Sequence, residues 1–98
     1  MPLVPLTDVL QPALREGFAV GAFNTFNEDF TDAIIKAALE ADAPVIVSVS
    51  EVQLDYVDLE CIAAVTRVKA NRSDIPVVLH LDHGLTLDTI QTAIDLGF

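Results

Sequence analysis

The sequence predicts an α/β fold in which parallel strands alternate with helices. Two observations support this prediction. Short apolar runs recur along the chain, and each is followed by a segment with helical hydrophobic periodicity. The most β-branched run is nearly continuous in its hydrophobicity, as is typical of a parallel strand buried on both faces. With 98 residues, the chain has room for one domain.

The first predicted element is a helix over residues 7–16. Thr7 is a suitable N-cap, and Gly17 is a suitable stop after the last turn. Pro12 falls inside this segment and predicts either a kink or a later start.

A strand is predicted next over residues 18–23, with Asn24 at its end. Asn27 can cap the following helix, whose first turn carries two acidic residues that suit the helix dipole. The apolar positions of this helix repeat at helical spacing and predict an inward stripe. The stripe consists of Phe30, Ile34, Ala37 and Ala41.

The second predicted strand covers residues 45–50 and is mostly β-branched. Asp58 can cap a third helix that continues to about Asn71. The predicted inward stripe of this helix consists of Cys61, Ile62, Val65 and Val68.

The third predicted strand covers residues 77–82. Thr86 can cap a fourth helix that Gly97 closes. Its predicted inward residues are Leu87, Ile90, Ala93 and Ile94. Strands separated by helices pair in parallel through crossover connections. Because a closed barrel needs more than three strands, we expect residues 1–98 to form a single partial domain, the opening part of a larger α/β fold.

The composition narrows the classes of partner. The net charge is −10, from 15 acidic against 5 basic residues, and it argues against binding to nucleic acid or anionic membranes. Phosphate groups can still bind locally at the N–H groups of helix starts. The single cysteine fits a reducing compartment, and no signal peptide or membrane-spanning run is evident, so we expect a cytoplasmic location. The 52% hydrophobic content favours packing against a partner chain or further sequence. We also expect a homo-oligomer.

Chemistry is predicted where the third strand ends. The run from Pro76 to Gly84 is apolar until it reaches Asp82 and His83. In parallel α/β proteins the carboxyl ends of the strands carry the active site. Asn24 and Ser50 end the two preceding predicted strands, so we expect these polar residues to converge on the same edge.

Asp82 and His83 suit metal-assisted acid–base chemistry. A neutral imidazole is a good zinc ligand, and a nearby carboxylate can accept and return a proton. Neighbouring strand residues point to opposite faces, so both can reach one site only if the strand is ending, and Gly84 permits such a turn. His80 has the same parity as Asp82 and suits either a supporting role or a core position.

Each of these candidate site residues also has a simpler, purely structural interpretation. An Asp-His-Gly sequence after a strand also suits a turn or a helix cap. Ser50 also suits a cap, and Asn24 suits a turn. Cys61 is interpreted as a packing residue on its helix. On pattern alone, the chain is part of an α/β enzyme.

The sequence resembles the zinc-dependent class II family of fructose-bisphosphate and tagatose-bisphosphate aldolases along its whole length. The resemblance lies in three runs, the last being the most specific: residues 17–24, residues 43–51 and residues 76–84. The resemblance implies a TIM barrel, of which this chain would supply about three strands and four helices. It also implies reversible aldol cleavage of a ketose 1,6-bisphosphate to dihydroxyacetone phosphate and an aldehyde such as glyceraldehyde 3-phosphate.

The same resemblance assigns roles. His83 matches a zinc-binding histidine, and Asp82 matches the acid that exchanges a proton with the C4 hydroxyl of the substrate. Asn24 and Ser50 match positions near the bound substrate. Members of the family have roughly three times this length, in keeping with the size of a whole barrel. The remaining zinc ligands lie outside these residues, so we expect the chain alone to be inactive.

Two other functions compete with this one. A truncated piece of a barrel could serve as a non-catalytic module that binds itself or a partner through its open strand edges. Another TIM-barrel lyase that acts on a sugar phosphate would share the fold, because a fold does not determine a function.

Overall fold

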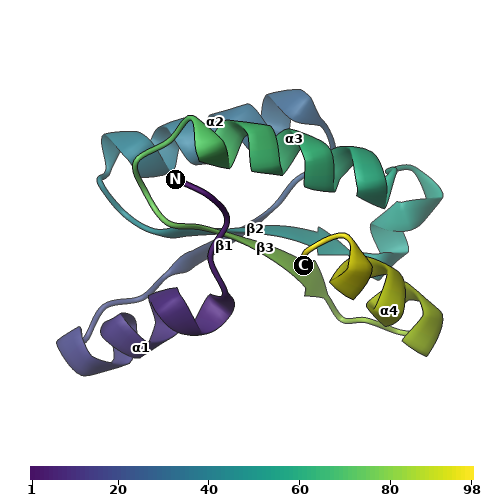
Figure 1. Cartoon of the computed structure of the whole chain (residues 1–98), viewed down its shortest axis with the longest axis horizontal. Coiled ribbons are helices and arrows are strands. Elements are labelled where there is room, and N and C mark those ends of the chain that lie inside the picture. The colour runs from purple at the N-terminus through teal and green to yellow at the C-terminus, as the bar shows by residue number, and fades with distance from the viewer.

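A computed structural model describes residues 1–98 and shows one parallel sheet of three strands with helices on both faces (Figure 1). The strands lie in chain order, and they are β1 (Gly21–Asn24), β2 (Val45–Ser50) and β3 (Val77–Asp82). The helices are α1 (Leu6–Glu16), α2 (Glu28–Glu40), the 3-10 helix η1 (Glu51–Asp55), α3 (Leu59–Asn71) and α4 (Leu87–Asp95). The predicted order of elements is confirmed, and η1 is an addition to it.

The two faces of the sheet have separate cores. On one face, α2 and α3 lie side by side over the strands (Figure 1), and Ile35 and Ala63 join a cluster around Val47. On the other face, Val9 of α1 packs against Ile46. Alternation along β2 explains the division, because neighbouring strand residues point to opposite faces. All six residues of β2 are buried, as expected for a strand covered on both sides.

Three of the four predicted N-caps are confirmed. The side chains of Asn27, Asp58 and Thr86 each accept a hydrogen bond from the backbone N–H three residues later, at 3.0, 3.1 and 3.2 Å. The prediction for Thr7 is wrong, because α1 begins at Leu6 behind Pro5, without a side-chain cap. Proline suits the start of a helix, since its fixed φ matches the first turn and its missing N–H has no partner there.

The first strand is shorter than predicted at its start. Gly17 adopts a left-handed conformation, and both its N–H and that of Phe18 donate to the carbonyl oxygen of Ala13. These bonds end α1, and they occupy the N–H of Phe18, so this group cannot pair with β2. Pairing with β2 begins only at Gly21, and Asn24 is the last residue of the strand.

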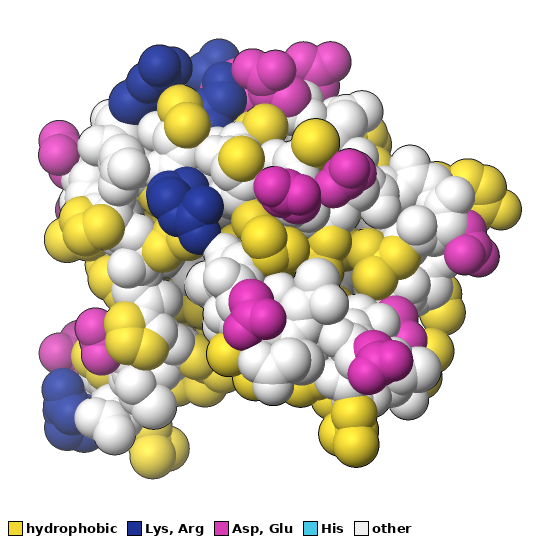
Figure 2. Space-filling view, turned by 45° about the vertical axis from the view of Figure 1, so that its right-hand side comes forward, with side chains coloured by type: hydrophobic (Ala, Val, Ile, Leu, Met, Phe, Trp, Pro, Cys, Tyr) yellow, Lys and Arg dark blue, Asp and Glu magenta, His cyan; other side chains and the backbone are white.

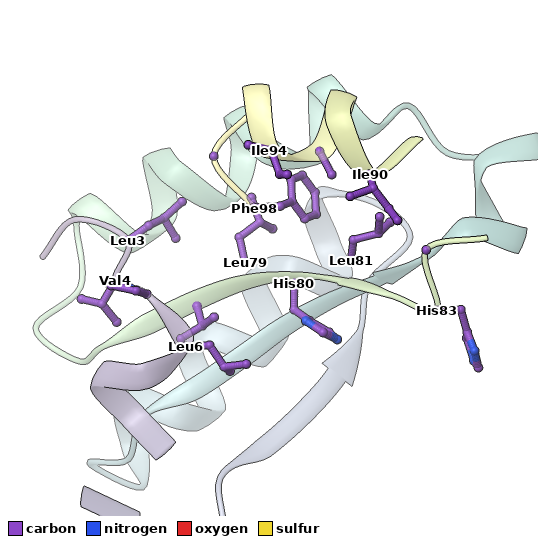
Figure 3. A pocket seen from close by; sticks show the side chains of 15 residues that line it. Leu3, Val4, Leu6, Leu79, His80, Leu81, His83, Ile90, Ile94 and Phe98 are labelled. Atoms are coloured by element: carbon purple, nitrogen blue, oxygen red, sulfur yellow. The ribbon is translucent and has the colours of Figure 1, made fainter. Parts of the chain in front are cut away.

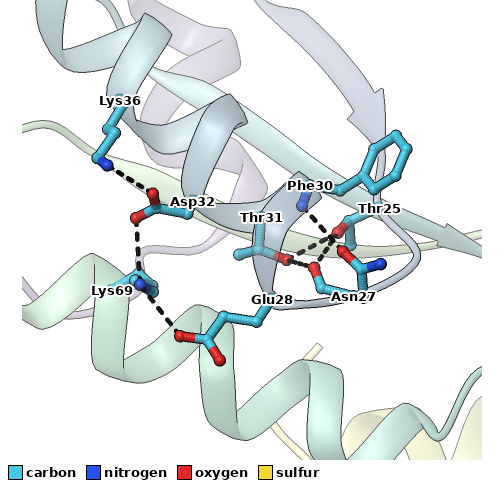
Figure 4. Close-up of polar contacts among 8 residues, drawn as sticks. All are labelled: Thr25, Asn27, Glu28, Phe30, Thr31, Asp32, Lys36 and Lys69. Atoms are coloured by element: carbon cyan, nitrogen blue, oxygen red, sulfur yellow. Dashed lines mark hydrogen bonds and ion pairs between the residues drawn. The ribbon is translucent and has the colours of Figure 1, made fainter.

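The inward stripe of α2 is displaced by one residue from the prediction. Its buried residues are Thr31, Ile35 and Ala38. Thr31 can face the sheet because its hydroxyl lies 2.7 Å from that of Thr25 and donates to the carbonyl oxygen of Asn27 (Figure 4). The predicted stripe borders the open edge of β1 instead: Phe30 is exposed, and Ile34, Ala37 and Ala41 line an apolar groove.

The predicted stripes of α3 and α4 are also partly wrong. In α3, Ile62 is buried as predicted, but Cys61 and Val68 are exposed, and smaller residues such as Ala63 and Ala70 face the sheet. Small residues let the helix approach the strands closely, which a pattern of large apolar residues does not reveal. In α4 only Ala93 is buried. Leu87 and Ile94 are exposed.

The surface is consistent with the composition. Figure 2 shows more acidic than basic side chains on one face, with hydrophobic side chains exposed between them. None of the helices has the length and apolar character needed to cross a membrane.

Candidate active site at the strand ends

The predicted polar residues lie on one face of the sheet. In the register of the strands, Asn24 pairs with Ser48, and Ser48 pairs with His80. Two residues further along, Ser50 pairs with Asp82. Residues with this spacing share a face, and paired residues on neighbouring strands lie about 4.8 Å apart. The convergence predicted for Asn24, Ser50 and Asp82 therefore follows from the register.

This face changes character along the strands. Its first row is apolar, with Ile46 and Val78 packed beneath α1. The next rows are polar and lead to the carboxyl ends of the strands. Ser48 belongs to the polar rows but was not predicted as a site residue. Its parity with Ser50 is the signal in the sequence that places it on this face.

Asp82 and His83 lie together at the end of β3. The Nε2 atom of His83 is 3.6 Å from a carboxylate oxygen of Asp82. The side chains are 67% and 41% exposed for His83 and Asp82, respectively, so solvent or a ligand can reach both. Ser50 is buried beside them, and Asn24 is exposed. The structure thus places an imidazole, a carboxylate and a hydroxyl at the ends of two neighbouring strands.

A tight turn at His83 allows the two neighbours to approach each other. His83 has a φ of 73°, and Gly84 follows with a φ of 57°. The N–H of Gly84 donates to the carbonyl oxygen of Asp82 at 3.1 Å, which closes a three-residue turn around His83. The prediction of a turn is confirmed, but it places a left-handed conformation on the histidine as well as on the glycine. Such a conformation is uncommon for a residue with a side chain and is frequent at functional sites.

Gln53 was not predicted, and it connects the ends of two strands. Its side-chain oxygen accepts from the N–H of Ser50 at 2.8 Å, and its side-chain nitrogen donates to the carbonyl oxygen of Thr25 at 3.0 Å. Gln53 is buried and therefore satisfies both backbone groups away from water. The signal in the sequence is a serine followed three residues later by glutamine, the spacing of a capping box.

The structure supports only part of a metal site. No cluster of three or more histidine, cysteine, aspartate or glutamate side chains is suitably placed to hold an ion. His83 offers one exposed imidazole, which fits a single ligand of a larger set. A catalytic zinc site needs two further protein ligands, and these residues do not provide them.

His80 lies beside an apolar groove along the open edge of β3. Figure 3 shows Leu79 and Leu81 on the α4 side of the strand, His80 on the opposite side, and His83 on the loop beyond. His80 is half-buried. Because His80 lies two residues before Asp82 on β3, the two side chains share the polar face of the sheet.

A parallel sheet with crossover helices and polar side chains at the carboxyl ends of its strands is the arrangement in which the class of α/β proteins places its active sites. The sequence model of the family "Fructose-bisphosphate aldolase class-II" matches residues 4–98. The chain belongs to this family.

Similar proteins extend the comparison. The chain is 41% identical to the fructose-bisphosphate aldolase of Staphylococcus epidermidis over 102 residues, covering all of this chain and 35% of that protein. It is 38% identical to the fructose-bisphosphate aldolase of Giardia intestinalis, covering all of this chain and 31% of that protein. Its structure matches the YdjI aldolase of Escherichia coli K12 with a TM-score of 0.91 at 27% identity, covering 98% of this chain and 38% of the other.

The chain therefore spans about a third of the length of the relatives it matches. Its three strands and four α-helices have the fold of the N-terminal part of an aldolase TIM barrel, as predicted.

Proposed function

We propose that residues 1–98 supply the N-terminal part of a metal-dependent aldolase. The enzyme would reversibly cleave a ketose 1,6-bisphosphate to dihydroxyacetone phosphate and an aldehyde such as glyceraldehyde 3-phosphate. The observation that carries this proposal is the Asp82–His83 pair at the end of β3, with Ser50 in register beside it, in a chain of the aldolase family.

Asp82 is proposed as the catalytic base and acid. In cleavage, its carboxylate takes the proton of the C4 hydroxyl while the C3–C4 bond breaks. The C4 oxygen becomes the aldehyde carbonyl, and the electron pair of the broken bond remains on the three-carbon fragment. In condensation the same carboxyl group returns the proton. The exposure of Asp82 gives the substrate access to it.

The other residues bind and orient. His83 is proposed as one ligand of Zn²⁺, and the remaining ligands come from outside these residues. When bound, Zn²⁺ supplies a Lewis acid that polarises the ketone carbonyl of the substrate. Asn24 and Ser50 are proposed to contact the substrate, because both lie on the face that leads to Asp82.

The chain by itself is expected to be inactive. It brings one exposed imidazole to the site, whereas catalytic zinc needs three protein ligands. Aldol cleavage by the purified 98-residue chain at the rate of an ordinary aldolase would overturn this expectation.

Replacing Asp82 tests the proposed function, and the test uses the native protein that contains this sequence. We expect Asp82→Asn to lower kcat for cleavage of fructose 1,6-bisphosphate by about 10²- to 10⁴-fold, because proton transfer loses its carboxylate. Asp42→Asn is the matched control, since Asp42 is exposed and precedes β2 at the opposite end of the sheet. Unchanged activity in Asp82→Asn would exclude the proposed role.

A second candidate function is a non-catalytic module that associates with itself. Two apolar grooves favour it, one beside the open edge of β1 and one along the open edge of β3. The mass and zinc content of the native protein distinguish the two functions. Zinc at about one ion per chain, in a protein roughly three times this length, supports the aldolase. A protein of this length without zinc supports the module.

A further inference from the structure

We propose that Glu51 is a positioning residue for the site, whose carboxylate holds the loop after β3 in the turn that places His83 beside Asp82. The effect on catalysis rests on the proposed function, whereas the effect on the loop does not.

Glu51 connects the end of one strand to the loop that follows the next. It is the first residue of η1, directly after β2. Its Oε1 atom accepts hydrogen bonds from the N–H of Leu85 at 2.7 Å and from the N–H of Thr86 at 3.3 Å. Among side chains, only that of Glu51 hydrogen-bonds to the backbone of residues 83–85. The loop therefore depends on one carboxylate for its attachment to the neighbouring strand.

The charge of Glu51 suits this task. Hydrogen bonds to an ionised acceptor are roughly twice as strong as those between neutral groups. Thr86 is the N-cap of α4, so the carboxylate also lies at the helix end that favours negative charge. A neutral or shorter side chain would lose one or both of these advantages.

The loop needs such an attachment because its turn is unfavourable by itself. His83 holds a left-handed φ, and such conformations persist only where surrounding contacts impose them. Without Glu51, the segment from His83 to Thr86 would keep the bond from Gly84 to Asp82 but lose its link to β2. The imidazole of His83 would then sample other positions relative to the carboxylate of Asp82.

Gln53 provides a similar connection between the ends of β1 and β2. It joins the N–H of Ser50 at the end of β2 to the carbonyl oxygen of Thr25 after β1. Two side chains of η1 thus connect the ends of all three strands. Sites whose groups must keep fixed distances benefit from such support, because small displacements of catalytic groups cost large factors in rate.

The test compares Glu51→Ala with Asp55→Ala in the native protein. Asp55 is the matched control, because it lies in the same 3-10 helix, carries the same charge, is exposed and makes no hydrogen bond to the loop. Three quantities are measured: amide hydrogen exchange at Leu85 and Thr86, the Kd for Zn²⁺ by chelator competition, and kcat and KM for fructose 1,6-bisphosphate.

We expect exchange at Leu85 and Thr86 to accelerate in Glu51→Ala but not in Asp55→Ala. The Kd for Zn²⁺ should rise by about 10- to 100-fold, the usual effect of removing a group that orients a ligand. We expect kcat to fall more than KM rises. Glu51→Gln should recover part of each loss, because its amide oxygen can still accept from both N–H groups.

The two proposals fail separately. Equal exchange at Leu85 and Thr86 in Glu51→Ala and Asp55→Ala would overturn the role of Glu51, whatever the activity. A wild-type protein that binds Zn²⁺ but does not cleave the bisphosphate would overturn the proposed function. Accelerated exchange in Glu51→Ala would then still support the attachment of the loop by this residue.

Discussion

His83 combines an unfavourable backbone with an exposed functional side chain. Its φ of 73° lies in the region that glycine adopts freely and other residues avoid. A glycine at this position would fold at less cost, but it would remove the imidazole from beside Asp82. This strain supports the proposal that the His83 side chain has a role in the site.

Two pairs of substitutions measure this strain. We expect His83→Gly to be more stable to urea than His83→Ala by about 1 kcal/mol, because alanine keeps the left-handed cost and glycine does not. At His80, inside β3, the order should reverse, and glycine should be less stable than alanine by about 0.5–1 kcal/mol. The same order at both positions would contradict the assignment of strain to His83.

The polar face of the sheet was largely predictable at the residue scale. Asn24, Ser50 and Asp82 each end a strand, and parallel strands bring such ends together. Glu51 was not predicted, since its role depends on the approach of a loop 34 residues away along the chain. Local sequence patterns contain no information about such a contact until the register of the strands is known.

At the scale of elements, one lysine connects the two helices that cover the sheet. The Nζ atom of Lys69 on α3 lies 3.1 Å from a carboxylate oxygen of Asp32 and 3.4 Å from one of Glu28, both on α2 (Figure 4). Asp32 also pairs with Lys36 at 2.7 Å. Hydrogen bonds from Lys36 and Lys69 hold the pKa of Asp32 below its usual 3.8. The hydrogen bond to Asp32 raises the pKa of Lys69 above its usual 10.5.

These shifts predict how the helix pair responds to pH. Asp32 has a lower pKa in the folded chain, so its contribution to stability is present above pH 3.8 and is lost as the pH falls through the lowered value. Lys69 has a raised pKa, so its contribution is present below pH 10.5 and is lost as the pH rises through the raised value.

We therefore expect Asp32→Asn to lower the melting temperature near neutral pH. The gap to the wild type should narrow as the pH falls below 3.8. Glu40→Gln is the control, because Glu40 lies on the same helix and forms no ion pair, and it should leave the melting temperature near that of the wild type. A gap for Asp32→Asn that stayed constant down to low pH would contradict an electrostatic origin.

The ends of the helices were more predictable than their faces. Caps depend on one side chain and the backbone three residues away, so Asn27, Asp58 and Thr86 are recognisable locally. The face that a helix buries depends on what lies opposite. Thr31 faces inward because Thr25 offers its hydroxyl, and Cys61 faces outward because Ala63 fits closer to the sheet.

At the scale of the whole molecule, the sheet has two open edges, and each borders an apolar groove. Ile34 and Phe23 line the groove beside β1, and Ile94 and Leu81 line the groove beside β3 (Figure 3). Unpaired strand edges with apolar surroundings favour association with other chains or with further sequence. This explains why Ala37 and Ala41 of α2 and Ile94 of α4, which were predicted to face inward, are exposed here: they line the grooves beside the unpaired strand edges.

This arrangement predicts the behaviour of the isolated chain in solution. Because both edges and both grooves are uncovered, the 98-residue chain should associate, with a sedimentation mass above 10.5 kDa that increases with concentration. Ile94→Asp should reduce the association, since it places a charge in the groove beside β3. Leu14→Asp is the control, because Leu14 is 86% exposed on α1 and lines neither groove. A constant mass of one chain at every concentration would show that the open edges do not pair. In that case something other than a second copy must cover the exposed apolar faces. Because the chain belongs to the aldolase family, the partner we would then infer is further sequence that completes the barrel.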